Sequence, residues 1–125
     1  MCDILVVDDS QLVRATLVSV LEAEGWNVRE ADCPVDAMRI MSDPDLTCSV
    51  LVTDIDLGAG TDGFSIAVKV RKLAPKHPIV YVTGRPWVFD DRCFDEAERT
   101  LSKPFKAESL ILAILAVAPG LGRAA

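Results

Sequence analysis

The sequence predicts one α/β domain, a doubly wound parallel sheet of five strands with helices on both faces. Three observations lead to this fold. Short runs rich in β-branched residues alternate with segments of helical periodicity along the whole chain. The first run, residues 3–8, is apolar between its two end acids, as expected for a central strand that is covered on both faces. The length of 125 residues fits one domain, which we place at residues 1–118, with a short C-terminal tail at 119–125.

The first strand leads into a helix whose apolar residues recur at helical spacing between residues 12 and 21. Ser10 is a suitable N-cap for this helix, and Gly25 stands where a C-cap glycine belongs. Residues 26–31 alternate weakly between apolar and polar types and predict a second strand. Pro34 then suits the first turn of a second helix.

A third strand is predicted at residues 49–54, and a glycine-rich loop at 57–63 follows it. The loop leads into a helix that ends at Pro75. Residues 78–83 predict a fourth strand, with its proline at the entry, where no hydrogen-bond donor of the sheet is lost.

The last third of the chain is less regular. Gly84 and Pro86 interrupt residues 84–98, where we expect one short helix. Residues 100–102 predict a minimal fifth strand, and residues 107–117 predict a strongly apolar last helix. Strands joined through helices in this way pair in parallel, with right-handed crossovers.

Composition and charge exclude several kinds of partner. The chain has 13 Lys and Arg against 19 Asp and Glu, a net charge of −6, which repels nucleic acid and anionic lipid. Residues 110–118, the longest apolar run near the C-terminus, reach about half the length of a membrane-spanning helix. The first residues lack the basic start of a signal peptide. We therefore expect a cytoplasmic protein without a nucleic-acid or membrane partner.

The four cysteines are widely spaced, and no Cys-x-x-Cys pair occurs among them. Free cysteine is commonly a small buried residue. We therefore expect small core residues with reduced thiols, in a reducing cytosol, at all of these positions, namely Cys2, Cys33, Cys48 and Cys93.

Polar side chains follow the predicted strands at their carboxyl ends. Asp8 and Asp9 follow the first strand, Asp54 ends the third, Thr83 ends the fourth and Lys103 follows the fifth. In a doubly wound sheet of order 2-1-3-4-5, ligands bind beyond these ends, between strands 1 and 3. The five side chains are therefore expected to share one site.

Three carboxylates so close together require a proton or a cation. Two such charges about 4 Å apart repel by about 4 kcal/mol at an effective dielectric constant near 20. Carboxylate oxygens with retained water suit Mg²⁺. A carboxylate nucleophile, a divalent ion, an ammonium and a hydroxyl together provide what an aspartyl-phosphate centre needs, because phosphoryl transfer depends mostly on positioning and charge neutralisation.

Residues 3–117 resemble the receiver domain of two-component response regulators. Five short segments in order carry the resemblance: Leu5-Val6-Val7-Asp8-Asp9-Ser10, Leu51-Val52-Thr53-Asp54-Ile55-Asp56-Leu57, Asp62-Gly63, Val80-Tyr81-Val82-Thr83-Gly84 and Leu101-Ser102-Lys103-Pro104-Phe105. The resemblance implies a flavodoxin-like fold in a stand-alone receiver. It also implies that a sensor histidine kinase or a histidine phosphotransfer protein donates the phosphoryl group, and that the downstream target is a protein.

The resemblance also assigns roles within the expected site. Asp54 would be the phosphoacceptor, and Asp8 and Asp9 would hold Mg²⁺ together with Asp54 and the backbone carbonyl of Asp56. Thr83 would contact the phosphoryl oxygens.

Lys103 would contact the same oxygens, and its bond to Pro104 would be a cis peptide that orients the lysine. Family members vary their reaction rates through the residues two positions after the acceptor and two after the hydroxyl. Here these are Asp56 and Arg85, which have opposite charge. We predict that they pair over the phosphoryl group and restrict attack by water.

The sequence departs from the family pattern at two places. Thr100 stands where the family usually has an aromatic ring that swings inward on phosphorylation, so the usual switch is not available. Trp87 or Phe89, just after Thr83, is a candidate replacement. The loop at residues 57–63 lacks the usual proline and is one residue longer than the common pattern.

The last helix, residues 109–117, is apolar on nearly all sides, whereas a surface helix usually keeps a polar face. Two interpretations remain open. The helix packs tightly on the end of the domain, or it forms a homodimer or partner surface.

The expected function is a receiver that catalyses only its own phosphorylation and autodephosphorylation and signals by protein binding or phosphorelay. Two alternatives remain open. Residues 54–58 loosely resemble the motif of haloacid-dehalogenase-type phosphatases, which use an aspartate nucleophile, although that motif should open the fold and no room is left for a cap domain. The second alternative is a receiver fold that binds its partner without phosphorylation.

Overall fold

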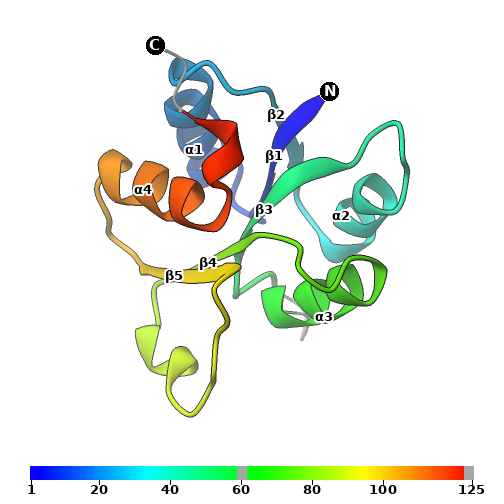
Figure 1. Ribbon diagram of the computed structural model, residues 1–125. Coiled ribbons are helices and arrows are strands. Elements are labelled where there is room, and N and C mark those ends of the chain that lie inside the picture. The colour runs from blue at the N-terminus through cyan, green and yellow to red at the C-terminus, as the bar shows by residue number, and fades with distance from the viewer. Residues whose placement is uncertain (59–61, 123–125) are drawn as a thin grey trace.

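A parallel sheet of five strands forms the middle layer of the computed structural model, which describes residues 1–58 and 62–122 (Figure 1). The strand order is β2-β1-β3-β4-β5, so the predicted fold is confirmed. The strands are β1 (Cys2–Val7), β2 (Val28–Ala31), β3 (Cys48–Asp54), β4 (Ile79–Thr83) and β5 (Glu98–Ser102).

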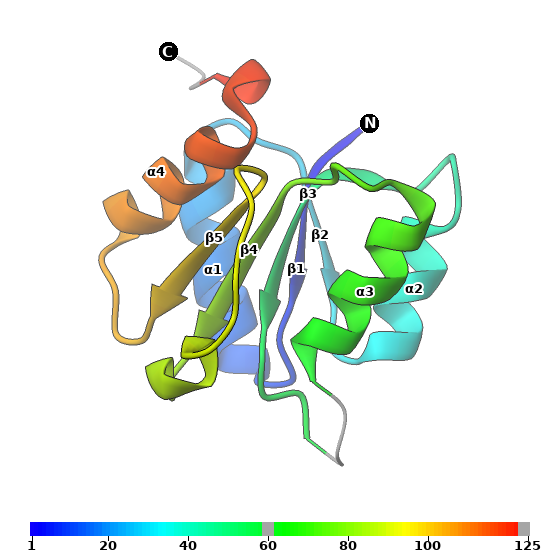
Figure 2. The same ribbon diagram turned by 60° about the horizontal axis from the view of Figure 1, so that its bottom comes forward.

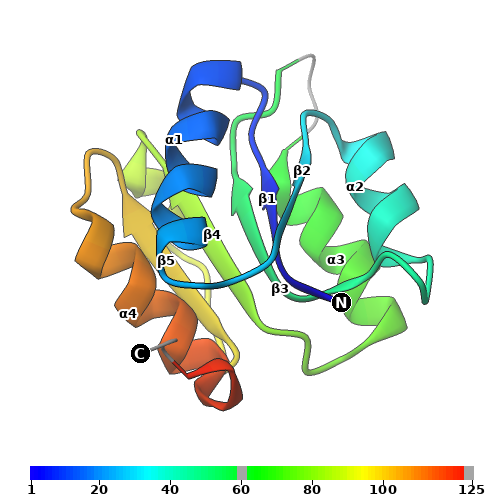
Figure 3. The same cartoon turned by 90° about the horizontal axis from the view of Figure 1, so that it is seen from above.

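Two layers of helices cover the sheet. The helices are α1 (Gln11–Ala23), α2 (Pro34–Met41), α3 (Gly63–Leu73) and α4 (Ala107–Val117). Helices α1 and α4 lie on one face, and α2 and α3 lie on the other (Figure 3). Along β1, Ile4 and Val6 join the core beneath α1 and α4, whereas Leu5 and Val7 join the core beneath α2 and α3. All four side chains are buried, which explains why residues 4–7 are all apolar.

The helix ends follow the predicted signals. The Ser10 hydroxyl accepts a hydrogen bond from the Val13 N–H at the start of α1. Gly25 has a φ of 91° just beyond the end of α1, a conformation that favours glycine. At the start of α3, Asp62 Oδ1 accepts a hydrogen bond from the Ser65 N–H at 2.9 Å. The glycine-rich loop before α3 lies partly outside the described residues.

The connection from β4 to β5 contains no α-helix. The expected short helix is a single 3₁₀ turn, η1 (Pro86–Phe89), followed by a coil that runs back to β5 (Figure 2). Proline starts this turn, and Asp91, with a φ of 62°, lies in the coil that follows it. The expectation that a short helix separates β4 from β5 is therefore met only by one turn, because Asp90 is extended and Asp91 has a positive φ, which end the helical geometry there.

An aromatic cluster takes the place of a covering helix beside β4. Phe64 packs against Tyr81 with ring centroids 5.2 Å apart, and Tyr81 packs against Phe94 at 5.5 Å. Phe89 meets the Phe64 and Phe94 rings edge-on. These contacts attach the irregular segment to α3 and β4.

Cys2 and Cys48 form a disulfide, so the expectation of four reduced thiols is wrong for this pair. The two residues are direct neighbours in the parallel pairing of β1 with β3, and their Cα atoms are 4.5 Å apart. Strand register brings them together across 46 positions of sequence. Cys33 and Cys93 are free thiols, as expected, but Cys33 is only partly buried and Cys93 is exposed, so the expectation of small core residues is wrong for these two.

Helix α4 is attached to the sheet through a buried face that includes Leu110, Ile111 and Ile114. On its outward side, the Leu112 side chain is 56% exposed. Packing on the sheet thus accounts for most of the apolar character, and a homodimer through the outward side stays a prediction. Across residues 1–58 and 62–122, no helix has the length and apolar character needed to cross a membrane.

The described part of the predicted C-terminal tail folds back onto the domain. Residues Pro119–Leu121 form a 3₁₀ turn, η2, and Leu121 packs against the core beneath α1 and α4. The Trp26 indole Nε1–H donates a hydrogen bond to the Gly122 carbonyl at 3.1 Å.

His77, the only histidine in the chain, is expected to make the protein less stable in mild acid. Burial, with the nearby Arg71 charge, lowers the pKa of His77 from 6.5 to about 4. The unfolded chain therefore binds a proton that the folded chain excludes. The resulting stabilisation is complete above pH 6.5 and is lost as the pH falls toward 4.

Between pH 7 and pH 5, we expect the free energy of unfolding of the wild type to fall by about 2 kcal/mol more than that of His77→Gln. Urea unfolding of the wild type and the variant at both pH values measures this difference. Equal pH dependence in the two proteins would contradict the prediction.

Candidate functional site

Four strands end at the same edge of the sheet, and the predicted polar residues lie there (Figure 2). Asp8 and Asp9 follow β1, and Asp54 is the last residue of β3. One carboxylate oxygen from each of these three residues lies within 4.8 Å of the other two. Thr83 ends β4, and Lys103 follows β5. The structure thus brings together the five side chains that the sequence placed in one site.

The carboxylates differ in exposure. Asp8 and Asp54 are 1% and 7% exposed, whereas Asp9 is exposed to solvent. The Ser10 N–H donates to Asp8 Oδ1 at 2.9 Å, and the Asp56 N–H donates to Asp54 Oδ1 at 3.2 Å. The two buried carboxylates are therefore held by backbone N–H donors, whereas the Asp9 side chain is exposed to solvent.

Lys103 lies between the two buried carboxylates. Its Nζ is 3.4 Å from Asp8 Oδ2 and 3.3 Å from Asp54 Oδ2. The Lys103 N–H donates to the Thr83 carbonyl at 2.8 Å, and the peptide bond from Lys103 to Pro104 is cis. The ammonium therefore balances part of the negative charge of the cluster.

Burial raises the pKa of the Asp54 carboxyl above its usual value of 3.8. The Lys103 charge acts in the opposite direction, and the Asp8 carboxylate adds to the increase. The effect of burial on the pKa of Asp54 is thus larger than the opposite effect of the Lys103 ammonium. A carboxylate that is poorly solvated in this way is a suitable nucleophile.

Asp56 and Arg85 pair above Thr83, as the sequence predicted from their opposite charges. Arg85 Nε donates to Asp56 Oδ2 at 3.2 Å, and a second guanidinium nitrogen contacts Asp56 Oδ1. The Arg85 hydrogen bond is the main reason that the pKa of Asp56 is lowered. The Thr83 hydroxyl donates to Asp56 Oδ2 at 3.4 Å and accepts from the Arg85 N–H at 3.1 Å. The pair and the hydroxyl thus form one hydrogen-bonded unit.

The donor set fits Mg²⁺. Asp8, Asp9 and Asp54 supply three hard oxygen ligands within reach of one ion, and the exposed Asp9 leaves a path from solvent. The Asp56 side chain is engaged by Arg85, so Asp56 would contribute through its backbone carbonyl, as the family resemblance implies.

Arg14 of α1 supports this site, although the sequence analysis did not identify it. One guanidinium nitrogen donates to the Asp8 carbonyl at 2.9 Å, and Nε contacts Glu30 Oε1 on β2 at 2.9 Å. The sequence contains an indication of this role, because Arg14 lies four residues after the Ser10 N-cap, on the first turn of the helix that follows Asp8. Its contacts hold the backbone that presents the two adjacent acids.

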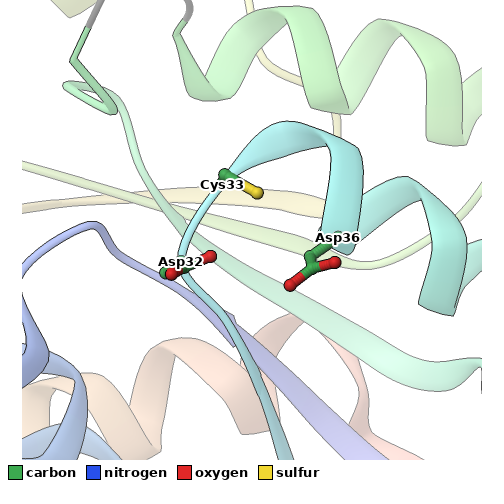
Figure 4. A group of neighbouring side chains, drawn as sticks. All are labelled: Asp32, Cys33 and Asp36. Atoms are coloured by element: carbon green, nitrogen blue, oxygen red, sulfur yellow. The ribbon is translucent and has the colours of Figure 1, made fainter.

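Asp32, Cys33 and Asp36 form a second group of possible metal ligands, on the turn from β2 into α2 (Figure 4). Asp36 lies in the first turn of α2, where a helix favours acidic side chains. This preference accounts for the position of Asp36 without an ion.

Thr100, where the usual ring is missing, and the two candidate replacements, Trp87 and Phe89, differ in their exposure. Thr100 is exposed on β5, opposite Tyr81 in register. The Trp87 side chain on η1 is 60% exposed. Phe89, in contrast, is part of the aromatic cluster. A switch role for Trp87 or Phe89 stays a prediction.

Comparison with known proteins agrees with the geometry of the site. Residues 4–115 match the response regulator receiver domain family. The chain is 32% identical over 111 residues to the aerobic respiration control protein ArcA of Escherichia coli, covering 87% of this chain and 45% of that protein. It is 33% identical over 120 residues to the peroxide stress-activated histidine kinase mak3 of Schizosaccharomyces pombe, covering 90% of this chain and 5% of that one. This chain thus spans less than half the length of either relative.

Among solved structures, the receiver domain of NtrX from Brucella abortus superimposes with a TM-score of 0.74 at 29% identity. The match covers 92% of this chain and 98% of that domain.

Proposed function

Because the chain belongs to the response regulator receiver domain family, we propose that Asp54 accepts a phosphoryl group from a phosphohistidine of a sensor kinase or of a phosphotransfer protein. The phosphorylated form then signals through altered protein binding or passes the group on in a relay. The observation that carries this proposal is the position of Asp54, a buried carboxylate at 3.3 Å from the Lys103 ammonium and within reach of Asp8 and Asp9.

In the proposed reaction, an Asp54 carboxylate oxygen attacks phosphorus, the bond from phosphorus to the donor imidazole breaks, and the imidazole leaves with the electron pair. The Lys103 ammonium neutralises charge on the phosphoryl oxygens, and the Thr83 hydroxyl can donate a hydrogen bond to one of them. Bound by Asp8, Asp9, Asp54 and the Asp56 carbonyl, Mg²⁺ would supply further charge neutralisation. In hydrolysis, water replaces the carboxylate and inorganic phosphate leaves. The protein would thus catalyse only its own phosphorylation and dephosphorylation.

Incubation with acetyl phosphate and Mg²⁺, followed by intact-protein mass spectrometry, tests this proposal. We expect an acid-stable, base-labile phosphoryl adduct on the wild type and none on Asp54→Asn. Asp90→Asn, an exposed carboxylate with the same change of charge, is the matched control and should form the adduct.

The other outcomes separate the alternatives. Steady phosphate release from many monoesters would favour the haloacid-dehalogenase-type phosphatase. An unmodified wild type would favour a receiver fold that binds without phosphorylation.

Arg85→Ala is expected to speed loss of the phosphoryl group about tenfold. The Arg85–Asp56 pair lies next to the Thr83 hydroxyl, where its side chains would obstruct water approaching the phosphoryl group. Decay of the adduct after removal of acetyl phosphate measures the rate. Arg92→Ala, which removes an equal charge outside this pair, should decay like the wild type. An unchanged rate in Arg85→Ala would show that the pair does not limit access of water.

A further inference from the structure

A hollow of about 450 Å³ opens between α3, β4 and the coil that precedes β5. Three rings (Phe64, Tyr81 and Phe94) and three cations (Arg71, Lys72 and Arg92) are among the residues that line it. Three of its lining residues, at 92–94, follow the 3₁₀ turn that stands in place of an α-helix. Figure 2 shows this turn and the coil that follows it. None of the carboxylates of the phosphorylation site lines it.

The side chains that line this hollow include three cations and one acid, in a chain with a net charge of −6. The positive charge comes mainly from the α3 side, since residues 63–77 contain four basic residues and no Asp or Glu, whereas the coil at residues 90–98 contains five acids and one Arg. Glu98 is the one acid among the described residues that line the hollow, and it is engaged internally. Its Oε2 accepts a hydrogen bond from the Tyr81 hydroxyl, and its Oε1 accepts one from the Asp95 N–H.

Two of the three cations are available to a partner. Arg71 is already paired with Asp95 at 2.6 Å. Within residues 1–58 and 62–122, no carboxylate oxygen lies within 4.0 Å of the charged nitrogens of Lys72 or Arg92. Lys72 is exposed, and the Arg92 guanidinium lies over the Phe64 ring, 3.5 Å from its centroid.

The apolar side of the hollow suits an inserted side chain better than a stacked base. The Phe64 ring is covered by Arg92 on one side, and the rings of Tyr81 and Phe94 pack at tilted angles against their neighbours. At the rim, Val68 is 57% exposed. Single-stranded nucleic acid would need free ring faces and would meet repulsion from the net charge of the protein.

We propose that this hollow binds an acidic segment of a partner protein. An apolar side chain of the segment enters the hollow beside the rings, and its carboxylates meet Lys72 and Arg92. The complementary charge is confined to Lys72 and Arg92, because the rest of the coil at residues 90–98 is acidic. The surface does not depend on the phosphorylation chemistry, so its test uses the unphosphorylated chain.

Fluorescence anisotropy with three labelled twelve-residue peptides tests the proposal. The first alternates glutamate with leucine and phenylalanine, the second has serine in place of the apolar residues, and the third has lysine in place of glutamate. We expect the first peptide to bind at least tenfold more tightly than the other two. A labelled single-stranded oligonucleotide should bind more weakly than the first peptide.

Two variants locate the binding. Lys72→Glu should weaken binding of the first peptide at least tenfold. Lys69→Glu, the same change of charge on an exposed residue of α3 outside the hollow, should have little effect. Val68→Ser, at an exposed position that a folded protein tolerates, should also weaken binding.

Three results would overturn the proposal. The first is a dissociation constant for the first peptide weaker than about 1 mM. The second is equal weakening by Lys72→Glu and Lys69→Glu, which would show only general charge attraction. The third is tighter binding of the oligonucleotide, which would assign the surface to nucleic acid.

Discussion

Lys103→Gln is expected to slow phosphorylation of Asp54 by acetyl phosphate at least about a hundredfold. The Lys103 ammonium lies 3.3 Å from Asp54 Oδ2, so it stands next to the place that a phosphoryl group on Asp54 would occupy and can neutralise charge on the phosphoryl oxygens during transfer. Glutamine can still donate a hydrogen bond, but it carries no charge. The loss therefore measures the electrostatic part of the lysine's role.

The same substitution should lower the free energy of unfolding by about 1–3 kcal/mol. Asp8 and Asp54 are buried, and Lys103 contacts both. Without the ammonium, two buried carboxylates remain at short range with less compensation. Urea unfolding without Mg²⁺ measures this change.

Lys106→Gln is the matched control, because Lys106 is exposed and lies three residues further along, at the start of α4. It should phosphorylate and unfold like the wild type. If Lys103→Gln reached the wild-type rate at saturating Mg²⁺, Lys103 would only balance the acidic cluster and would take no part in transfer.

Much of the site could be predicted because of a property of parallel sheets. The carboxyl ends of the strands meet at one edge, so residues next to apolar runs that are distant in sequence must lie close together. Asp8 and Asp54 could be placed together for this reason. The Asp56–Arg85 pair could also be predicted, because each residue stands two positions beyond a residue already assigned to the site.

What could not be predicted depends on register and on packing between elements. The disulfide joins Cys2 to Cys48 because β1 and β3 pair with these residues side by side, and apolar runs do not specify that alignment. Likewise, Gly84 and Pro86 indicate an irregular segment, but they do not show that Phe94 returns to pack on Tyr81. Such contacts depend on the tertiary arrangement of the chain.

Gly63→Ala is expected to destabilise the protein by about 3 kcal/mol or more. A Cβ at this position would lie 2.3 Å from the Asp54 carbonyl oxygen and 2.9 Å from Thr53 Oγ1. Both atoms belong to the end of β3, which is buried in the middle of the sheet. Because the nearest atom is backbone, it cannot move aside as a flexible side chain would. The strand end or the start of α3 must shift instead.

This shift would also affect phosphorylation, because the backbone that must move carries the Asp54 side chain. We therefore expect folded Gly63→Ala to form less phosphoryl adduct than the wild type under the conditions that test the proposed function. Gly120→Ala is the matched control, since a Cβ there would have no heavy atom within 4 Å. Its urea midpoint and adduct yield should equal those of the wild type. Equal urea midpoints for Gly63→Ala and the wild type would show that β3 and α3 can move apart without loss of stability. The close approach of Gly63 to the end of β3 would then not be what positions Asp54.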